Sequence, residues 1–229
     1  AWTYNSDNVS MLPAMINTLF MTVLALLLSV PFGVGAAIYL VEYAKKGNKL
    51  VGIIRVTAET LSGIPSIIYG LFGMLFFVTA LKWGYSMMAG AATLAIMVLP
   101  VIMRTTEEAL LCVPDSFREG SFGLGAGKLR TIFKIVLPSA IPGILSGIIL
   151  AIGRIVAETA ALIYTSGTVA NLAGFFDSGR TLAIHMYSLS REGMHTNEAY
   201  ATAVVLLIVV LIINGVSSLI AKKFEAPKQ

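Results

Sequence analysis

Five long apolar segments that contain no charged residue dominate the chain. Each reaches or exceeds the about 18 residues that an α-helix needs to cross a bilayer. Their apolar positions do not alternate with polar ones over about ten residues, as they would in the strands of a transmembrane barrel. Because backbone groups in hydrocarbon must be paired within the segment, the pattern predicts an all-α polytopic membrane protein with about five spans. The segments are residues 8–41, 60–81, 83–103, 135–153 and 199–221.

Prolines interrupt three of these segments and predict kinks. Pro31, Pro65 and Pro100 lie inside apolar sequence, the first two close to glycines. A bilayer tolerates such breaks where neighbouring helices or a cavity satisfy the freed backbone groups. The kinks therefore indicate either a pathway between the helices or ordinary packing of small residues.

Two charged residues follow the fourth apolar segment. A helix that begins at Pro142 needs about 20 residues to cross the membrane, so we expect it to extend past Arg154 and Glu158 to about Ile163. The spacing of four would place both charged side chains on one helix face. An arginine in mid-span costs about 2.5–3.5 kcal/mol on insertion scales, so the two should face a cavity or a partner.

The distribution of basic residues predicts how the chain lies in the membrane. Of 229 residues, 57% are hydrophobic and 12% are charged, and the formal net charge is +4. Loops rich in Lys and Arg lie in the cytoplasm, so we expect the N-terminus outside and the C-terminus in the cytoplasm. Orientation explains the basic excess better than a nucleic-acid surface does, and no nucleic-acid partner is expected. The expected cytoplasmic side carries Lys45, Lys46, Lys49, Arg55, Arg104, Arg118, Lys128, Arg130, Lys134, Lys222, Lys223 and Lys228, and the other side carries Lys82, Arg180 and Arg191.

This topology divides the chain into three parts. Residues 1–10 are expected outside, residues 11–221 form the transmembrane domain, and residues 222–229 form a cytoplasmic tail. Within the domain, 104–135 is the expected cytoplasmic loop and 166–198 the expected outside loop. The first apolar segment is too long for a signal peptide, so an outside start leads us to expect an odd number of spans upstream.

The expected cytoplasmic loop contains a polar, glycine-rich segment, residues 118–138, with the sequence REGSFGLGAGKLRTIFKIVLP. Before it, Pro114 and Asp115 suit the first turn of a short helix, because proline lacks the N–H that would be unpaired there and an acidic side chain suits the positive end of the helix dipole. We expect a helix, a glycine turn and a second short helix. The segment does not match a Walker A loop, because Phe122 and Leu129 stand where that motif requires glycine and Ser or Thr.

Seven residues of this segment resemble the EAA loop of ABC importer permeases, in which Glu-Ala-Ala is followed at fixed spacing by Gly and by Ile-x-Leu-Pro. In this chain Gly120 and Ser121 replace the two alanines. The family carries the motif in a cytoplasmic loop between spans. The resemblance implies a type I ABC importer permease bundle in which this loop couples the permease to its ATPase. The matching residues are Glu119, Gly120, Ser121, Gly125, Ile135, Leu137 and Pro138.

Four further stretches resemble the permeases of phosphate importers, in particular the PstA-like subunit. They are LSGIPSIIYGLFG (61–73), LPVIMRTTEEAL (99–110), PGILSGIILAIGRIVAET (142–159) and TLAIHMYSLSREG (181–193). The resemblance implies a multi-pass protein of the prokaryotic plasma (inner) membrane. It also implies four partners: a second permease subunit, a cytoplasmic ABC ATPase dimer, an extracytoplasmic phosphate-binding protein and membrane lipid. A partner would hydrolyse ATP, so no catalytic residue, cofactor or metal is expected in this chain.

Arg154 and Glu158 are the candidate substrate-binding residues under this interpretation. Arg154 would offer its planar guanidinium to a phosphate oxyanion, and Glu158 would accept from it or limit how tightly the anion is held. The alternative is a closed structural ion pair. Molybdate or sulfate is the alternative substrate, because an arginine-based site does not by itself identify the anion.

Other functions fit the sequence less well. An intramembrane hydrolase would need Ser with His, or paired Asp, inside the spans, and the expected spans contain no His and no Asp. A passive channel would not need a coupling loop.

Other polar residues have simpler explanations. We expect Arg55 and Glu59 to form a salt bridge at the membrane interface. His185 and His195, ten residues apart, have a poor spacing for a metal and are expected to be solvated loop residues.

Overall fold

The computed structural model of the chain describes residues 10–45, 47–193 and 195–224. Over these residues the fold is all-α, as predicted, and no strand is present. Four helical stretches are long and apolar enough to cross a membrane, or five if a bent pair counts as one span, so the prediction of about five spans is confirmed. In chain order, with η for a π-helical segment, the elements are α1 (Leu12–Ile38), η1 (Tyr39–Tyr43), α2 (Lys49–Ser62), α3 (Ser66–Gly73), η2 (Met74–Ala80), α4 (Met87–Leu111), α5 (Asp115–Gly123), α6 (Lys128–Thr131), η3 (Ile132–Val136), α7 (Leu137–Val156), α8 (Ala160–Ile163), α9 (Leu182–Glu192) and α10 (Thr196–Phe224).

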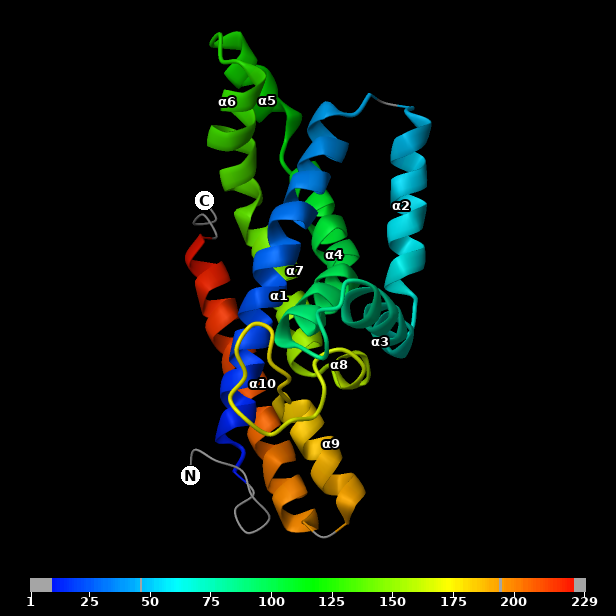
Figure 1. Ribbon diagram of the computed structural model, residues 1–229. Helices are drawn as coiled ribbons and strands as arrows, with labels where there is room; N and C mark the ends of the chain where they lie inside the picture. Colours follow the sequence, from blue (N-terminus) through cyan, green and yellow to red (C-terminus); the bar gives the residue numbers. More distant parts are fainter. Residues whose placement is uncertain (1–9, 46, 194, 225–229) are drawn as a thin grey trace.

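Helices α1, α4 and α7 form the centre of the bundle (Figure 1). The buried side chains of Met21, Leu94 and Met97 fill the interface between α1 and α4, and Ile155 at the end of α7 joins them. Helix α10 packs against α7 and α9 and exposes apolar side chains, Leu211 among them. In a membrane these exposed side chains are available to lipid or to a neighbouring membrane subunit.

The second predicted span, residues 60–81, is not one straight helix. Helix α2 ends at Ser62, and α3 with η2 continues at an angle of 101° after a short break. Pro65 causes the break, because the residue before a proline disfavours the helical conformation and the proline itself then serves as the N-cap of α3. The kink predicted at Pro65 is therefore present. Helix α2 buries none of its side chains and lies at the edge of the bundle (Figure 1).

Gly70 allows α3 to pack closely against α8. A Cβ atom at this position would lie 2.8 Å from the Cα atom of Ala161, which is closer than real side chains approach a backbone. Two small residues therefore permit the contact, as is common between membrane helices. Figure 1 shows the two short helices side by side.

Helix α7 ends at Val156, earlier than predicted. Helices α6, η3 and α7 run on as one stretch of 29 residues, Lys128–Val156, so the span gains its length on the side before Pro142. The prediction that Arg154 and Glu158 share one helix face is wrong, because the helix breaks between them. The span does not begin at Pro142. A π-helical turn widens the backbone ahead of Pro138 and Pro142, so the helix continues through both prolines.

The segment between α8 and α9 is irregular, but one side chain of α1 fixes it to the bundle. The Nδ2 atom of Asn17 donates to the carbonyl oxygens of Asn171 (2.9 Å) and Arg180 (3.2 Å). Its Oδ1 atom accepts from the backbone N–H of Ala173 (3.1 Å). All three bonds end on main-chain atoms, which would otherwise lack partners in a segment without regular structure.

His185 is buried in α9, and the prediction that it is a solvated loop residue is wrong. Only 1% of its surface is exposed, because α9 packs against α1 and α10. Burial, together with the nearby charge of Arg180, lowers the pKa of His185 to about 4. The imidazole is therefore neutral at pH 7, and a polar loop sequence gave no sign of the apolar surroundings.

The lowered pKa of His185 predicts that acid destabilises the protein. An unfolded histidine binds a proton near pH ~6.5, whereas the native one does so only near pH 4. The stability that neutral His185 contributes is complete above the pKa of the unfolded histidine. It is lost as the pH falls from that pKa to the native one, because the unfolded chain then binds more protons. We expect the thermal unfolding temperature in detergent to decrease as the pH is lowered from the unfolded pKa to the native one. The decrease should be smaller for His185→Gln. His195→Gln is the control, and an unchanged pH dependence for His185→Gln would contradict the prediction.

Candidate coupling and substrate sites

The predicted helix, glycine turn and helix are present between α4 and α7, and we call residues 115–131 the elbow. Pro114 is the N-cap of α5, with φ −57° and ψ 138°, and Asp115 lies in the first turn. The chain reverses at Gly125, whose φ of +81° favours glycine. Helix α6 then begins at Lys128. Figure 1 shows the elbow projecting from one end of the bundle.

The motif residues of the elbow differ in exposure. Glu119, Gly120 and Gly125 are exposed, whereas Ser121 is buried. The hydroxyl oxygens of Ser121 and Thr131 lie 2.8 Å apart and share a hydrogen bond. Serine in place of the alanine of the family pattern therefore ties α5 to α6, and Glu119 is left for contacts outside the elbow.

The other motif residues lie further along the same helical stretch. Ile135 is in η3, and Leu137 and Pro138 begin α7. The backbone N–H of Leu137 bonds to the carbonyl oxygen of Ile132, five residues earlier. This wide turn makes room for the ring of Pro138, which would otherwise clash with the preceding turn.

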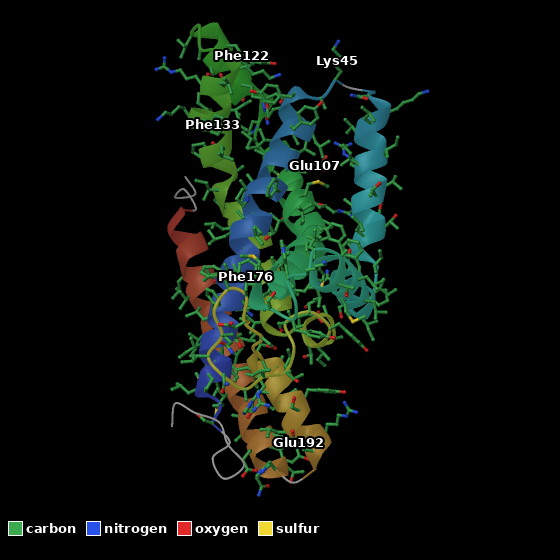
Figure 2. The ribbon with its side chains drawn as sticks, in the orientation of Figure 1. Lys45, Glu107, Phe122, Phe133, Phe176 and Glu192 are labelled. Carbon is green, nitrogen blue, oxygen red and sulfur yellow. The ribbon has the colours of Figure 1, made fainter. Side chains whose placement is uncertain are left out.

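Basic and apolar side chains surround the turn of the elbow. A cavity of ≈ 450 Å³ opens beside it, and Arg130 and Lys134 are among the residues that line it. Leu124 is 91% exposed, and Phe122 projects from the same end of the molecule (Figure 2). Together with the exposed Glu119 of α5, such a surface suits a protein partner with an apolar hollow and charges of both signs around it.

Arg118 is a residue of the elbow that the sequence pattern did not single out. Its Nε and Nη2 atoms donate to Oε1 of Glu42 at 3.1 and 2.8 Å. Nη1 donates to the carbonyl oxygen of Val113 (2.8 Å) and to Oδ1 of Asp115 (3.2 Å), and Nη2 donates to the carbonyl oxygen of Leu110 (2.9 Å). Glu42 precedes Arg118 by 76 residues, so no local sequence pattern could have shown this pair.

Arg154 and Glu158 lie on either side of the break after α7. Arg154 is half-buried and takes part in none of the ion pairs found among the described residues. The Oε1 atom of Glu158 accepts from the backbone N–H of Ala161 at 3.0 Å, so this carboxylate caps α8. The alternative prediction of a closed ion pair between Arg154 and Glu158 is therefore wrong.

Comparison with known proteins identifies the family. The sequence profile of the family described as "Binding-protein-dependent transport system inner membrane component" matches residues 29–226. The chain belongs to this family. It is an inner-membrane permease subunit of an ABC importer, as the EAA-like loop implied.

Named relatives and a solved structure agree with this assignment. The permease is 36% identical over 231 residues to the "Probable ABC transporter permease protein YqgI" of Bacillus subtilis, over 92% of this chain and 78% of the relative. It is 36% identical over 211 residues to the "Phosphate transport system permease protein PstA 1" of Mycobacterium tuberculosis, over 90% of this chain and 69% of the relative. An inward-facing structure of the MetNI methionine ABC transporter matches with a TM-score of 0.71 and 20% identity, over 93% and 94% of the two chains. The structural match supports the fold alone and confirms the type I permease bundle.

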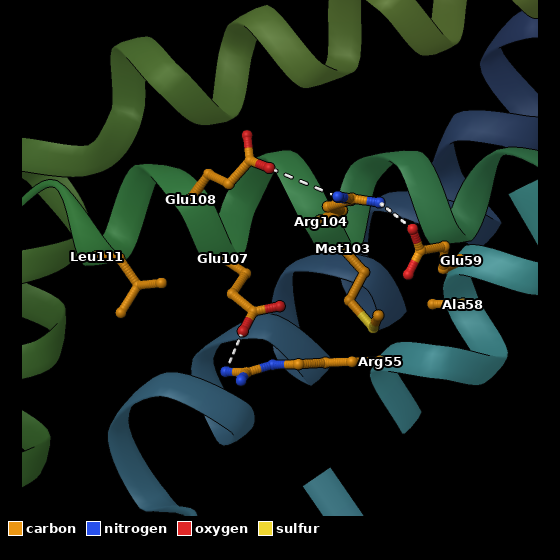
Figure 3. A pocket seen from close by; sticks show the side chains of 8 residues that line it. All are labelled: Arg55, Ala58, Glu59, Met103, Arg104, Glu107, Glu108 and Leu111. Atoms are coloured by element: carbon orange, nitrogen blue, oxygen red, sulfur yellow. Dashed lines mark ion pairs between the residues drawn. The ribbon is translucent and has the colours of Figure 1, made fainter. Parts of the chain in front are cut away.

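A cluster of charged residues joins α2 to α4 in the permease (Figure 3). Arg55 pairs with Glu107, and Arg104 lies 3.8 Å from Glu59 and 3.5 Å from Glu108. The salt bridge predicted within α2 is therefore replaced by pairs that reach across to α4. The cavity of ≈ 280 Å³ between these side chains has more carboxylates than guanidinium groups and does not suit an anion. The ion pairs instead hold α2, which buries no side chain of its own.

Removal of the Glu107 carboxylate should loosen α2. The side chain of Glu107 is 9% exposed, whereas that of Arg55 is 52% exposed, so water screens part of the charge that is left. We expect Glu107→Ala to cost about 1–2 kcal/mol of stability, between the values for exposed and buried pairs. Thermal unfolding in detergent measures this loss. Glu108→Ala is the matched control, because that side chain is 66% exposed, and an equal loss in both variants would contradict the prediction.

Proposed function

We propose that the permease moves inorganic phosphate into the cytoplasm with energy from a separate ABC ATPase. The observation that carries this proposal is the 36% identity, over 90% of the chain, to a relative named as a phosphate transport permease. The solved structure with the same fold is that of a methionine transporter, and at 20% identity it carries no argument about the substrate.

The proposal includes the partners that such a complex requires. They are a second permease subunit, a pair of cytoplasmic ATPase subunits and an extracytoplasmic phosphate-binding protein. The elbow supports the ATPase contact, because it projects from the bundle, exposes Glu119 and carries apolar and basic side chains at its turn. In this proposal Glu119, Gly120, Gly125 and the turn contact the ATPase, and Ser121 keeps the two arms of the elbow together.

Arg154 is the proposed phosphate-binding residue. Its guanidinium forms no ion pair among the described residues, and it lies where α7 ends within the bundle. A planar, permanently charged group with paired N–H donors suits an oxyanion better than an ammonium group does. Glu158 would act nearby by fixing the start of α8 and by limiting how tightly the anion is held.

The proposed orientation has residues 1–10 and 166–198 on the extracytoplasmic side and residues 42–56, 104–135 and 222–229 in the cytoplasm. Residues 1–9, 46, 194 and 225–229 are not among those that the structure describes. In Figure 2, Lys45 and Phe122 lie at one end of the molecule and Glu192 lies at the opposite end. We expect a cysteine placed at Lys128, with Cys112 replaced by Ser, to react only with reagent on the cytoplasmic side. Labelling from outside would overturn the orientation.

The proposed substrate can be tested by uptake into proteoliposomes that contain the assembled complex. We expect uptake of labelled phosphate that depends on ATP and that excess sulfate or molybdate does not suppress. If phosphate uptake is small and one of the two competitors suppresses it, the proposal is wrong. The permease is then assigned to that competing oxyanion.

A further inference from the structure

All five N–H groups of Arg118 are engaged within the permease. Two bonds reach Glu42, two reach the carbonyl oxygens of Leu110 and Val113, and one reaches Asp115. An arginine has five N–H donors, so none is left for an outside anion such as a phosphate group. The side chains of Arg118 and Glu42 are only 14% and 9% exposed. Arg118 therefore connects parts of the permease instead of offering a binding site.

The partners of Arg118 lie at the ends of two central helices. Glu42 belongs to η1, which continues α1, and Leu110 lies in the last turn of α4. The other contacts of helix α5 are with α6 and η3, and the one side chain that it buries, that of Ser121, bonds to Thr131 of α6. Without Arg118, α5 would be held through α6 and η3, which continue into α7, but would lose its side-chain bonds to the ends of α1 and α4.

The second arm of the elbow reaches the same π-helical segment. The ammonium group of Lys128, in α6, lies 4.7 Å from the centre of the Tyr43 ring in η1. Both arms of the elbow therefore contact η1, one through an ion pair and one through a cation–π contact. The ion pair is the stronger of the two links, because it is largely buried and made by two N–H groups of one guanidinium.

We infer that the ion pair between Arg118 and Glu42 is the joint through which the elbow moves α1 and α4 during transport. The inference rests on the proposed function, in which an ATPase acts on the elbow. A displaced α5 carries η1 and the end of α4 with it, because the bonds of Arg118 hold these three elements together. Without the joint, movement of the elbow reaches α7, which continues α6 and η3, but not the ends of α1 and α4, and ATP is hydrolysed without the matching movement of these two spans. Arg118 and Glu42 are positioning residues in this scheme, and the ATPase does not contact them.

The test compares Glu42→Gln with Glu108→Gln in the complete transporter in liposomes. Glu42→Gln keeps the size and the acceptor oxygen of the side chain but removes its charge. Glu108→Gln makes the same change in a 66% exposed carboxylate that also lies beside an arginine. We expect Glu42→Gln complexes to retain the ATPase and hydrolyse ATP, while phosphate import per ATP falls about fivefold or more. Arg118→Lys should behave in the same way, because an ammonium group cannot reproduce the guanidinium fork. Glu108→Gln should match the parental ratio.

A distance measurement separates a joint from a merely structural contact. Spin labels replace the exposed residues Ser116 of α5 and Tyr39 of η1, with Cys112 changed to Ser. In the parental complex the distance between the labels should stay the same when ATP is added, because the two elements move together. In the Glu42→Gln complex it should change or broaden with ATP.

Four outcomes would overturn the inference. If Glu42→Gln imports as much phosphate per ATP as Glu108→Gln, or its label distance does not respond to ATP, the joint is wrong and the proposed function stands. If both Glu42→Gln and Arg118→Lys fail to retain the ATPase, the pair serves assembly and not transmission. If the parental complex itself shows no ATP-driven import, the proposed function is wrong and the inference falls with it.

Discussion

Reversal of the charge at Glu119 should leave the permease folded in the membrane and reduce ATP-driven import by about tenfold or more. Glu119 is exposed on α5 and forms none of the hydrogen bonds or ion pairs found among the described residues, so Glu119→Lys removes no internal contact. A reversed charge in a docked surface costs several kcal/mol, and the elbow is the surface proposed to meet the ATPase. Import and co-purification of the ATPase, each measured per permease, test this expectation.

A matched control reverses the same charge at the other end of the molecule. Glu192 lies at the exposed end of α9, far from the elbow in Figure 2. Glu192→Lys should therefore retain the ATPase as the parental permease does. Gly125→Ala is a second variant of the elbow, because a side chain at φ +81° strains the turn by about 1 kcal/mol without changing its charge. Parental import and ATPase content in Glu119→Lys would show that the elbow is not the coupling surface.

Arg154→Lys should assemble normally and lose about tenfold in phosphate import, although it keeps the positive charge. Lysine lacks the planar fork that binds an oxyanion through two N–H groups, and its ammonium group holds water more tightly. Arg154 has no ion-pair partner among the described residues, so the change should cost little stability. Uptake per assembled complex, over a range of phosphate concentrations, measures the effect.

Glu158 supplies the comparison. Glu158→Gln keeps an oxygen that can accept from the backbone N–H of Ala161, so the cap of α8 survives and import should stay within about twofold of the parental rate. Glu158→Ala removes the cap and should reduce the amount of assembled permease. If Arg154→Lys imports normally while Glu158→Gln fails to assemble, the substrate role proposed for Arg154 is wrong.

The parts of the fold that depend on local chemistry could be predicted from the sequence. Apolar length predicted the spans, and Pro114 with the following glycines predicted the elbow, because each of these signals acts within a few residues of the structure that it causes. Gly125 shows this most clearly, since its positive φ is what allows the chain to reverse. The candidate coupling residues lie on the elbow, in η3 and at the start of α7, and their coupling role stays a prediction.

Features that depend on distant partners were missed. The kink at Pro65 was predicted, but hydropathy measures how long an apolar segment is and not its direction, so it could not give the angle of 101°. It also could not show that the span containing α7 gains its length before Pro142 and ends ahead of Glu158. The partners of Arg118 and Arg55 lie on other helices, and His185 is buried by elements far away in the chain. Tertiary packing decides these contacts, and a single sequence does not record it.

The way in which α1 holds the segment before α9 has a consequence for how such importers diversify. Asn17 bonds main-chain atoms of Asn171, Ala173 and Arg180, and Thr18 accepts from the backbone N–H of Leu182 at 2.9 Å. The exposed side chains of that segment, that of Leu172 among them, can therefore be exchanged by mutation while the attachment persists. Selection is thus free to vary the surface that this segment presents, whereas a change at Asn17 would cost three bonds at once. Amino-acid differences between related importers should therefore be more frequent in this segment than at Asn17 and Thr18 of α1, which hold it.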